Sequence, residues 1–266
     1  MDMPRNRFKH AIATPGRVPL GTWLVSGTAA TAEAMGCSGY DFLVLDTEHT
    51  PIDMAGMVDM LRAIEGTPAG VLTRVPWNDM VTVKRALDAG VQSLLFPFVQ
   101  DADEARRAVA NTRYPPDGVR GVAAVHRASR HGTVPNYHKG AAAELCVVVQ
   151  VETIDALGRL PEIAAVPGVD SLFIGPADLA ASMGHLGDMA HPEVQAKLKE
   201  GAQACRKAGK PVGIVGPNPE VVATYVDYGF TWVAMSSDIG MMVGRAQEWI
   251  GKVRASVPGM AAGPAR

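Results

Sequence analysis

The chain has 266 residues, a formal net charge of -2 and 47% hydrophobic residues. Acids and bases are interspersed, so the sequence offers no basic stripe for nucleic acid and no polybasic segment for a membrane surface. The amino-terminal stretch MDMPRNRFKHAI is polar, and no apolar run approaches the roughly 18 residues of a membrane helix. We therefore expect a cytoplasmic protein that acts on a small molecule, with no nucleic-acid or membrane partner.

Short apolar runs rich in β-branched residues alternate along the chain with longer stretches of helical periodicity. The apolar runs predict strands at Leu20–Val25, Phe42–Asp46, Val71–Val75, Ser93–Phe96, Leu145–Val151, Ser171–Ile174, Val212–Val215 and Trp232–Met235. Helices are expected near residues 29–37, 53–65, 79–89, 102–111, 154–165, 192–208, 218–228 and 239–254. This alternation is typical of βαβ units with a parallel sheet, and eight strands with eight helices predict an α/β fold of the (β/α)8 TIM-barrel type.

The length agrees with one barrel, for which about 250 residues are typical. We expect a single barrel domain over residues 1–256 and a flexible tail over residues 257–266. A doubly wound sheet would need a glycine-rich fingerprint after the first strand, and the sequence has none. Residues 112–143 form a connection longer than a barrel needs, so they are expected to pack against a barrel end or a partner subunit. The three cysteines, Cys37, Cys146 and Cys205, are expected to be buried free thiols.

Polar side chains follow several of the predicted strands, where a barrel enzyme places its active site. They are Asp46-Thr47-Glu48-His49, Arg74, Gln150 with Glu152, and Gly175-Pro176-Ala177-Asp178. Glu152 and Asp178 come from adjacent strands, so their carboxylates can bind one hard divalent cation, Mg²⁺, Mn²⁺ or Co²⁺ before Zn²⁺. The alternative is that each acid merely stabilises the start of the helix that follows it.

His49 and Arg74 are the candidate catalytic side chains. An imidazole titrates near neutrality, so His49 can act as a general base, although a lone histidine is usually structural. Arg74 offers a fixed cation for a keto or enolate oxygen, and its alternative role is a rim salt bridge to Asp46 or Glu48. No lysine follows a predicted strand, so a Schiff-base mechanism is not expected and an aldolase on this chain must stabilise its carbanion with a metal and Arg74.

Long motifs in this order resemble a known family. They are Gly21-Thr22-Trp23-Leu24, Leu45-Asp46-Thr47-Glu48-His49, Arg74-Val75-Pro76-Trp77-Asn78-Asp79, Arg113 to Gly121, Val149-Gln150-Val151-Glu152-Thr153 and Phe173 to Leu179. From about Pro4 to Arg254 the sequence resembles the metal-dependent HpcH/HpaI aldolases, and within them most resembles the 4-hydroxy-2-oxoheptanedioate aldolases of aromatic catabolism.

The resemblance implies a role for each candidate. His49 would accept a proton, Arg74 would stabilise an enolate, and Glu152 and Asp178 would bind the metal. Gln150, Ala177 and Asp178 would contact the substrate. Asp88 would raise the basicity of the catalytic histidine, but it ends a helix at the opposite face of the barrel, so it would have to serve a neighbouring subunit. The family assembles as homo-oligomers, commonly hexamers, and the same is expected here.

The implied reaction is reversible cleavage of a 4-hydroxy-2-oxo acid, such as 4-hydroxy-2-oxoheptanedioate, into pyruvate and an aldehyde. A 2-keto-3-deoxy sugar acid aldolase and a hydroxypyruvate-accepting aldolase are substrate alternatives. Thr47, Val215 and the stretch from Val122 to His126 depart from the family pattern and leave the aldehyde open. Two other classes are a non-catalytic barrel that binds a metal and a keto acid, and a phosphoenolpyruvate enzyme, for which the sequence lacks a phosphate loop.

Overall fold

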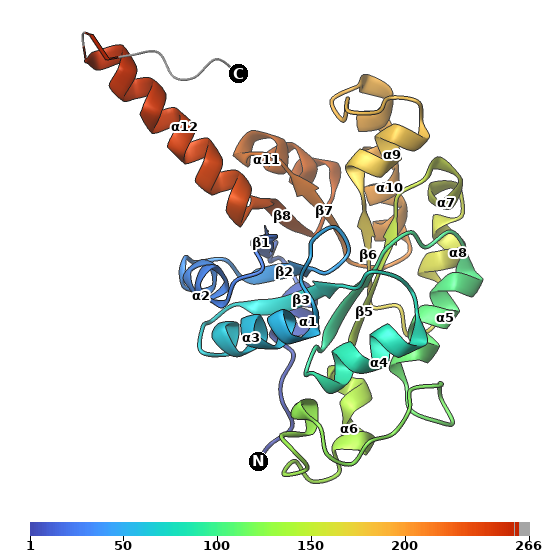
Figure 1. Cartoon of the computed structure of the whole chain (residues 1–266). Coiled ribbons are helices and arrows are strands. Elements are labelled where there is room, and N and C mark those ends of the chain that lie inside the picture. The colour runs from blue at the N-terminus through green and yellow to red at the C-terminus, as the bar shows by residue number, and fades with distance from the viewer. Residues whose placement is uncertain (258, 261–266) are drawn as a thin grey trace.

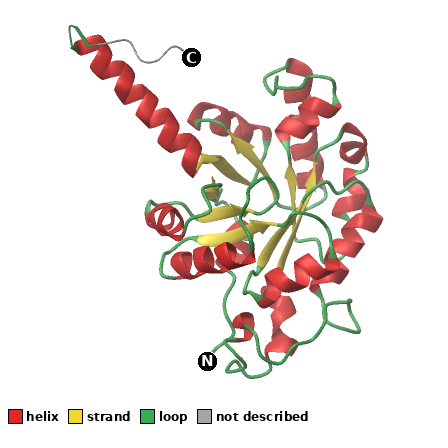
Figure 2. Cartoon of the chain, in the orientation of Figure 1, coloured by secondary structure: helices red, strands yellow, loops and turns green. Residues whose placement is uncertain are grey.

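The structure is a computed structural model and describes residues 1–257 and 259–260. Eight parallel strands close into a barrel in chain order, with β8 pairing with β1 (Figures 1 and 2). The strands are β1 (Leu20–Leu24), β2 (Phe42–Asp46), β3 (Gly70–Arg74), β4 (Ser93–Phe96), β5 (Cys146–Val151), β6 (Ser171–Ile174), β7 (Val212–Gly216) and β8 (Trp232–Ser237). The expected (β/α)8 fold is confirmed. Most of the tail expected over residues 257–266 lies outside the described residues.

Helices surround the barrel (Figure 1). They are α1 (Arg7–Ile12), α2 (Ala29–Cys37), α3 (Met54–Glu65), α4 (Met80–Asp88), α5 (Ala102–Thr112), the 3-10 helix η1 (Arg127–Ser129), α6 (Tyr137–Glu144), α7 (Ile154–Gly158), α8 (Leu160–Ala164), α9 (Pro176–Ser182), α10 (Pro192–Lys207), α11 (Pro219–Tyr228) and α12 (Asp238–Ser256). Several begin at a side chain that accepts a backbone N–H of the first turn, as Asp53 does from Gly56 and Asp79 does from Thr82. These caps satisfy donors that the helix leaves unpaired.

The interior of the barrel is filled mainly by large apolar side chains. Phe42 and Trp232 meet edge to face, and both contact Phe8 of α1 in the same way. Gly213 makes room for Trp232, because a Cβ at position 213 would lie 2.2 Å from the indole ring. All three aromatic side chains are fully buried, and each such burial stabilises the fold by about 1.5–3 kcal/mol. Helix α1 therefore closes the amino-terminal end of the barrel.

Several elements differ from those expected. The helix expected over residues 154–165 is divided into α7 and α8, because Pro161 lacks the amide hydrogen that a continuous helix needs there. The short helices α1 and α9 were not among the expected helices. The connection over residues 112–143 contains η1 and the start of α6, and Arg127 from it donates to the carbonyl oxygen of Ala89 at 2.9 Å. The expectation that this connection packs against a barrel end is therefore confirmed.

Helix α12 leaves the barrel. Its first residue, Asp238, is buried and accepts hydrogen bonds from the backbone N–H groups of Val25 at 2.9 Å and Ser26 at 3.2 Å. Beyond this anchor the helix projects away from the other elements (Figure 1), and apolar side chains along it are exposed, including Trp249 at 61% and Met242 at 59%. Among the described residues, the helix therefore lacks the apolar partner that the other barrel helices find on the strands.

The cysteine prediction is correct for two residues and wrong for the third. Cys146 and Cys205 are buried free thiols, and burial raises the pKa of Cys205 to about 12. Cys37 is exposed, because it occupies the last position of α2 on a face that no other described element covers. Among the described residues, no helix is long and apolar enough to cross a membrane.

Candidate active site

The carboxyl ends of β2 and β3 place an acid and an arginine side by side. Asp46 and Arg74 are paired in the strand register, and the guanidinium group donates two hydrogen bonds to the carboxylate. The Nε–Oδ1 distance is 3.0 Å and the Nη2–Oδ2 distance is 2.7 Å. The Arg74 guanidinium also lies over the ring of Trp23, 4.3 Å from its centroid. The alternative role foreseen for Arg74, a salt bridge, is thus present, and it fixes the direction in which this cation points.

Asp46 also organises the loop that carries His49. Its Oδ1 atom accepts the backbone N–H groups of Glu48 at 3.0 Å and His49 at 3.3 Å. Thr47, one of the departures from the family pattern, donates its hydroxyl to the carbonyl oxygen of Arg74 at 2.5 Å. Thr47 therefore holds β2 to β3 through its hydroxyl.

Glu48 connects the arginine to the histidine. Its Oε2 atom lies 3.2 Å from Nη1 of Arg74 and 3.6 Å from Nε2 of His49. Burial raises the pKa of Glu48, although the positive charge of Arg74 opposes that effect and Asp178 reinforces it. The His49 side chain is 65% exposed at the rim, so a substrate or a neighbouring molecule can reach its imidazole.

A second group of acids gathers at the ends of β5 and β6. Glu152 is buried, and its Oε1 atom accepts the backbone N–H of Phe98 at 2.8 Å. Its Oε2 atom accepts the side-chain amide of Gln150. Burial raises the pKa of Glu152 to about 7, and the charges of Asp178 and Glu48 raise it further against the two hydrogen bonds. Three carboxyl groups therefore come together where the barrel interior meets the rim.

This donor set fits a divalent cation. Carboxylates close together repel one another, and a cation between them would reverse the effect and favour their ionised forms. The buried Oε1 atom of Gln150 has no hydrogen-bond partner among the described residues. Gly175 leaves room for the acid beside it, because a Cβ at that position would lie 2.6 Å from Oε2 of Glu152. Oxygen donors of this kind suit Mg²⁺, Mn²⁺ or Co²⁺.

The helix-capping alternative applies differently to the two expected metal ligands, Glu152 and Asp178. Thr153, not Glu152, accepts the backbone N–H that begins α7. The capping explanation therefore does not account for Glu152. Asp178 is an exposed acid in the first turn of α9, next to Ala177, where a negative charge also stabilises the helix. Both roles remain compatible with the position of Asp178.

Asp88 lies at the other end of the barrel, at the last residue of α4. Its carboxylate accepts a hydrogen bond from the fully buried guanidinium of Arg120 at 2.7 Å, and Arg120 lies over the ring of Tyr114, 4.4 Å from its centroid. Within one chain Asp88 is therefore not brought to His49. Any action of Asp88 on His49 requires a second copy of the chain, as the sequence reasoning stated.

Lysines occupy the opposite end of the barrel strands. Lys9 donates to the carbonyl oxygen of Leu145, just before β5, at 2.7 Å, and Lys210 donates to that of Val169, just before β6, at 2.6 Å. These ammonium groups lie at the amino-terminal ends of the strands. Neither can form a Schiff base beside Arg74.

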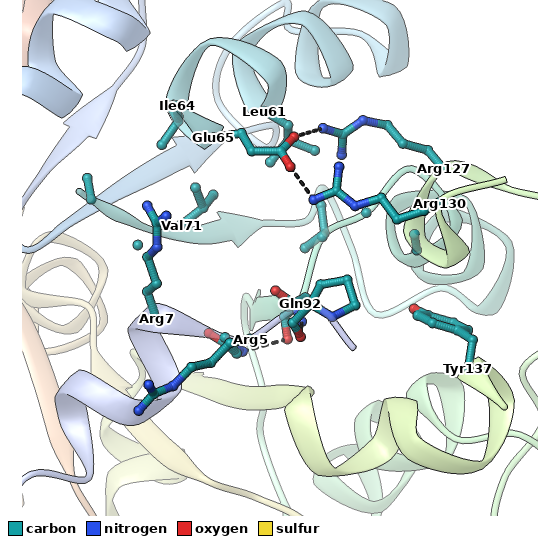
Figure 3. A pocket seen from close by; sticks show the side chains of 17 residues that line it. Arg5, Arg7, Leu61, Ile64, Glu65, Val71, Gln92, Arg127, Arg130 and Tyr137 are labelled. Carbon is teal, nitrogen blue, oxygen red and sulfur yellow. Dashed lines mark hydrogen bonds and ion pairs between the residues drawn. The ribbon is translucent and has the colours of Figure 1, made fainter. Parts of the chain in front are cut away.

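Two cavities in the described part of the chain are not lined by Arg74, Glu152 or Asp178. A cavity of about 280 Å³ lies near the amino-terminal ends of β3 and β4 and is drawn in Figure 3. On its edge Glu65 pairs with Arg127, at 3.0 Å, and with Arg130, which joins η1 to α3 (Figure 3). Here one carboxylate faces two guanidinium groups, whereas the carboxyl-end rim combines acids, an arginine and a histidine.

Sequence reasoning did not assign functions to several groups at the rim. Asp46 and Glu48 were considered only as partners of Arg74, and the backbone N–H of Phe98 was not foreseen. Phe98 has a φ of 55°, an uncommon value for a residue with a side chain, and its ring stacks on that of Trp77 at 6.2 Å. The aromatic residues at both positions could have been noticed as candidates, since both follow predicted strands.

Comparisons with known proteins identify the relatives of the chain. The family model described as "HpcH/HpaI aldolase/citrate lyase" matches residues 20–244. A 2-dehydro-3,6-dideoxy-6-sulfogluconate aldolase of Pseudomonas putida is 48% identical over 86% of this chain and 90% of its own. A hydroxypyruvate/pyruvate aldolase of Sagittula stellata is 45% identical over 94% of this chain and 100% of its own.

A solved structure extends the likeness to three dimensions. It is a HpcH/HpaI aldolase/citrate lyase family protein from Burkholderia cenocepacia J2315, 39% identical, with a TM-score of 0.91 over 94% of this chain and 99% of that one. Relatives named as aldolases cover nearly the whole barrel, so the resemblance to the HpcH/HpaI aldolases is confirmed. The chain belongs to the HpcH/HpaI aldolase/citrate lyase family, and it is a carbon–carbon lyase of the metal-dependent aldolase class.

Proposed function

We propose that this keto-acid aldolase reversibly cleaves 4-hydroxy-2-oxo acids into pyruvate and an aldehyde. The observation that carries the proposal is the arrangement at the rim. A guanidinium group locked by Asp46 lies beside Glu48, and Glu48 interacts in turn with the carboxyl group of Asp178. A fixed cation next to a cation-binding group of acids is what an enolate of a 2-oxo acid requires.

Glu152 and Asp178 would hold the divalent metal, with Mg²⁺, Mn²⁺ and Co²⁺ as the candidates. Bound there, the metal would supply a Lewis acid for the carboxylate and keto oxygens of the substrate. Gln150 and Ala177 would contact the pyruvyl half, together with Asp178. The hydrogen bonds from Phe98 and Gln150 keep the carboxylate of Glu152 directed at this place.

In the direction of synthesis, His49 accepts a proton from the methyl group of pyruvate. The electron pair of the broken C–H bond moves into the enolate, and the fixed guanidinium of Arg74 stabilises the negative charge on the enolate oxygen. The enolate carbon then attacks the carbonyl carbon of the aldehyde, whose oxygen takes the proton that His49 accepted and becomes the 4-hydroxyl. Cleavage runs through the same steps in reverse.

For the aldehyde half, we infer that sugar-derived acids are the first candidates. The relative at 48% identity is named for a sulfogluconate derivative, and one from Salmonella arizonae at 42% identity is named for 5-keto-4-deoxy-D-glucarate. This ranks a 2-keto-3-deoxy sugar acid ahead of 4-hydroxy-2-oxoheptanedioate and of a role in aromatic catabolism. The relative named for hydroxypyruvate supports testing that acid in place of pyruvate.

A substrate series tests this ranking. Pyruvate release, coupled to lactate dehydrogenase, would be measured with Mn²⁺ and with 4-hydroxy-2-oxo acids that differ only in the aldehyde half. The proposal expects the largest kcat/KM for a polyhydroxylated sugar acid. A larger value for 4-hydroxy-2-oxoheptanedioate would reverse the ranking and leave the aldolase activity intact. Borohydride added with pyruvate is expected not to inactivate the enzyme, because none of the described lysines lies at the rim to form a reducible imine.

We further propose that the enzyme works in the cytoplasm as a homo-oligomer, a hexamer by the family resemblance, in which Asp88 of one subunit acts on His49 of another. Support comes from the separation of the two residues within one chain and from the unpartnered helix α12. Mixed oligomers of His49→Ala and Asp88→Ala subunits test the idea. If each active site draws on two subunits, remixing restores sites that hold both wild-type residues and therefore restores activity. No recovery in verified mixed oligomers would show that Asp88 does not act on His49 of a neighbouring subunit.

A further inference from the structure

The connection between α9 and α10 brings two histidines and a glutamate together. His185, His191 and Glu193 each offer one ligand atom, and these atoms all lie within 4.8 Å of one another. Nε2 of His185 is 2.9 Å from Oε2 of Glu193, and the two imidazole rings stack with their centroids 3.5 Å apart. In the part of the chain that the structure describes, this is the one cluster of three such residues.

The backbone holds the three side chains in place. The N–H of His185 donates to the carbonyl oxygen of Ala180 in α9 at 2.8 Å, so His185 is attached to that helix. His191 begins α10, and its Nδ1 atom accepts the backbone N–H of Glu193 at 3.3 Å. The connection is further fixed by Gln195, which donates to the carbonyl oxygen of Met189 at 2.7 Å. Little backbone freedom would be lost if a ligand bound here.

The chemistry of the cluster suits a cation. The Glu193 carboxylate lies 2.9 Å from the imidazole of His185 and supplies an anionic oxygen ligand. Because Nδ1 of His191 is already an acceptor, its Nε2 atom is the one left for a ligand. Two imidazoles stacked this closely repel each other when both are protonated, whereas a single cation can be shared by both rings and the carboxylate.

We propose that His185, His191 and Glu193 form a second metal site, separate from the catalytic one, that takes Zn²⁺ or another imidazole-binding transition metal. Tetrahedral Zn²⁺ with ligand bonds of about 2.0–2.1 Å needs ligand atoms about 3.3 Å apart, which side-chain rotation can reach from the present arrangement. Water fills the fourth position. The donor set separates the two sites: two imidazoles select Zn²⁺ here, and oxygen ligands at Glu152 and Asp178 select Mg²⁺ or Mn²⁺.

Such a site would link two helices. His185 follows α9, and the first turn of α9 carries Ala177 and Asp178. His191 is the N-cap of α10 and Glu193 lies in its first turn, so a shared metal would join the end of α9 to the start of α10. The bound metal would stabilise the folded chain, because a ligand that binds only the folded state raises Tm.

Zinc binding to the full-length, tag-free protein tests the proposal independently of aldolase activity. Glu152→Ala removes one catalytic ligand, so that the His185 cluster is left as the main zinc site. Metals are first removed with a chelator, and zinc is then added. We expect this variant to retain one Zn²⁺ per chain after equilibrium dialysis in excess Mg²⁺, and its Tm to rise on zinc addition. Adding His185→Ala, or Glu193→Gln, is expected to remove that equivalent and the rise in Tm.

His10→Ala is the matched control, because His10 lies 3.4 Å from Glu144 in an exposed pair that lacks a second imidazole. It is expected to leave the zinc equivalent unchanged. The proposal is wrong if the Glu152→Ala protein binds no zinc. This result does not depend on whether the further variants fold. It is also wrong if His185→Ala and Glu193→Gln retain the same zinc content as their parent.

Discussion

Arg74 and Asp46 face each other across the ends of β3 and β2 as a two-point ion pair, with side chains only 10% and 3% exposed. The pair does more than neutralise two charges. It sets the plane of the guanidinium, and Asp46 additionally holds the backbone of the loop that carries His49. The position of His49, the proposed base, and the orientation of Arg74, the proposed partner of the enolate, therefore both depend on the carboxylate of Asp46.

Arg74→Lys is expected to lower kcat by about 100- to 1,000-fold and to change KM much less. Lysine keeps the charge, but it cannot hold the two-point contact with Asp46 and still present a planar donor to an enolate oxygen. Steady-state kinetics with Mn²⁺ measures the effect. Arg85→Lys, on the exposed side of α4, is the control and should have wild-type kinetics. A loss below tenfold in Arg74→Lys would mean that Arg74 has no part in stabilising the enolate.

The metal-stripped protein should lose stability as the pH rises through about 7, and Glu152 should be the cause. The pKa of Glu152 is raised from 4.5 to about 7, chiefly by burial, so the folded state keeps a proton that the unfolded chain releases. The contribution of this group is fully present below pH 4.5 and is lost as the pH rises through the folded-state value. A shift of this size corresponds to about 3 kcal/mol.

Urea unfolding of the metal-stripped protein between pH 5 and 8 measures this loss. In Glu152→Gln the loss should be nearly absent, because the amide does not ionise. Glu33→Gln, at an exposed position of α2, should follow the wild type. If wild type and Glu152→Gln lose free energy of unfolding in parallel, the carboxyl of Glu152 titrates normally and the proposed account of its burial is wrong.

Gly175→Ala should weaken Mn²⁺ binding by at least about tenfold with little effect on folding. The backbone at Gly175 has φ -79° and ψ 103°, which alanine adopts without strain, but the added Cβ would meet Oε2 of Glu152 at 2.6 Å and displace it. Isothermal titration calorimetry gives the affinity. Gly158→Ala has open space around the new Cβ and should keep the wild-type affinity. Unchanged Mn²⁺ affinity in Gly175→Ala would argue against Glu152 as a ligand.

Trp249→Asp on α12 should reduce the size of the assembly. The indole is 61% exposed on a helix that projects from the barrel, so an oligomer that covers this helix would have to bury the new charge. Light scattering after size-exclusion chromatography measures the mass. Gln247→Asp, also exposed on α12, adds the same charge to the same helix and serves as the control. If Trp249→Asp keeps the mass of the wild type, this part of α12 lies outside the subunit contacts.

The barrel could be predicted because its strands are short apolar runs separated by amphipathic helices, and each expected strand lies within two residues of the observed one. Helix α1 could not be predicted, because the burial of Phe8 depends on Phe42 and Trp232, which come from strands far along the chain. Cys37 shows the opposite error, because an apolar neighbourhood in sequence did not become a buried position on α2.

The candidate site was predictable to the extent that strand ends converge. The adjacency of Asp46 and Arg74 follows from the parallel register of β2 and β3. The pairing of Asp88 with Arg120 did not follow, because it joins a helix end to a loop whose path no periodicity describes. The hydrogen bond from the N–H of Phe98 to Glu152 depends on a left-handed backbone at a residue that rarely adopts it.

The most direct test of the aldolase assignment at this site is pyruvate release from a 4-hydroxy-2-oxo acid by metal-stripped enzyme, before and after addition of Mn²⁺, in wild type and in Glu152→Ala. The proposed site predicts activity that returns with Mn²⁺ in the wild type and does not return in Glu152→Ala, although both proteins remain folded. Equal activity in the two proteins, or cleavage that needs no metal, would contradict it. A wild type that cleaves no acid with any metal would instead indicate a keto-acid-binding barrel.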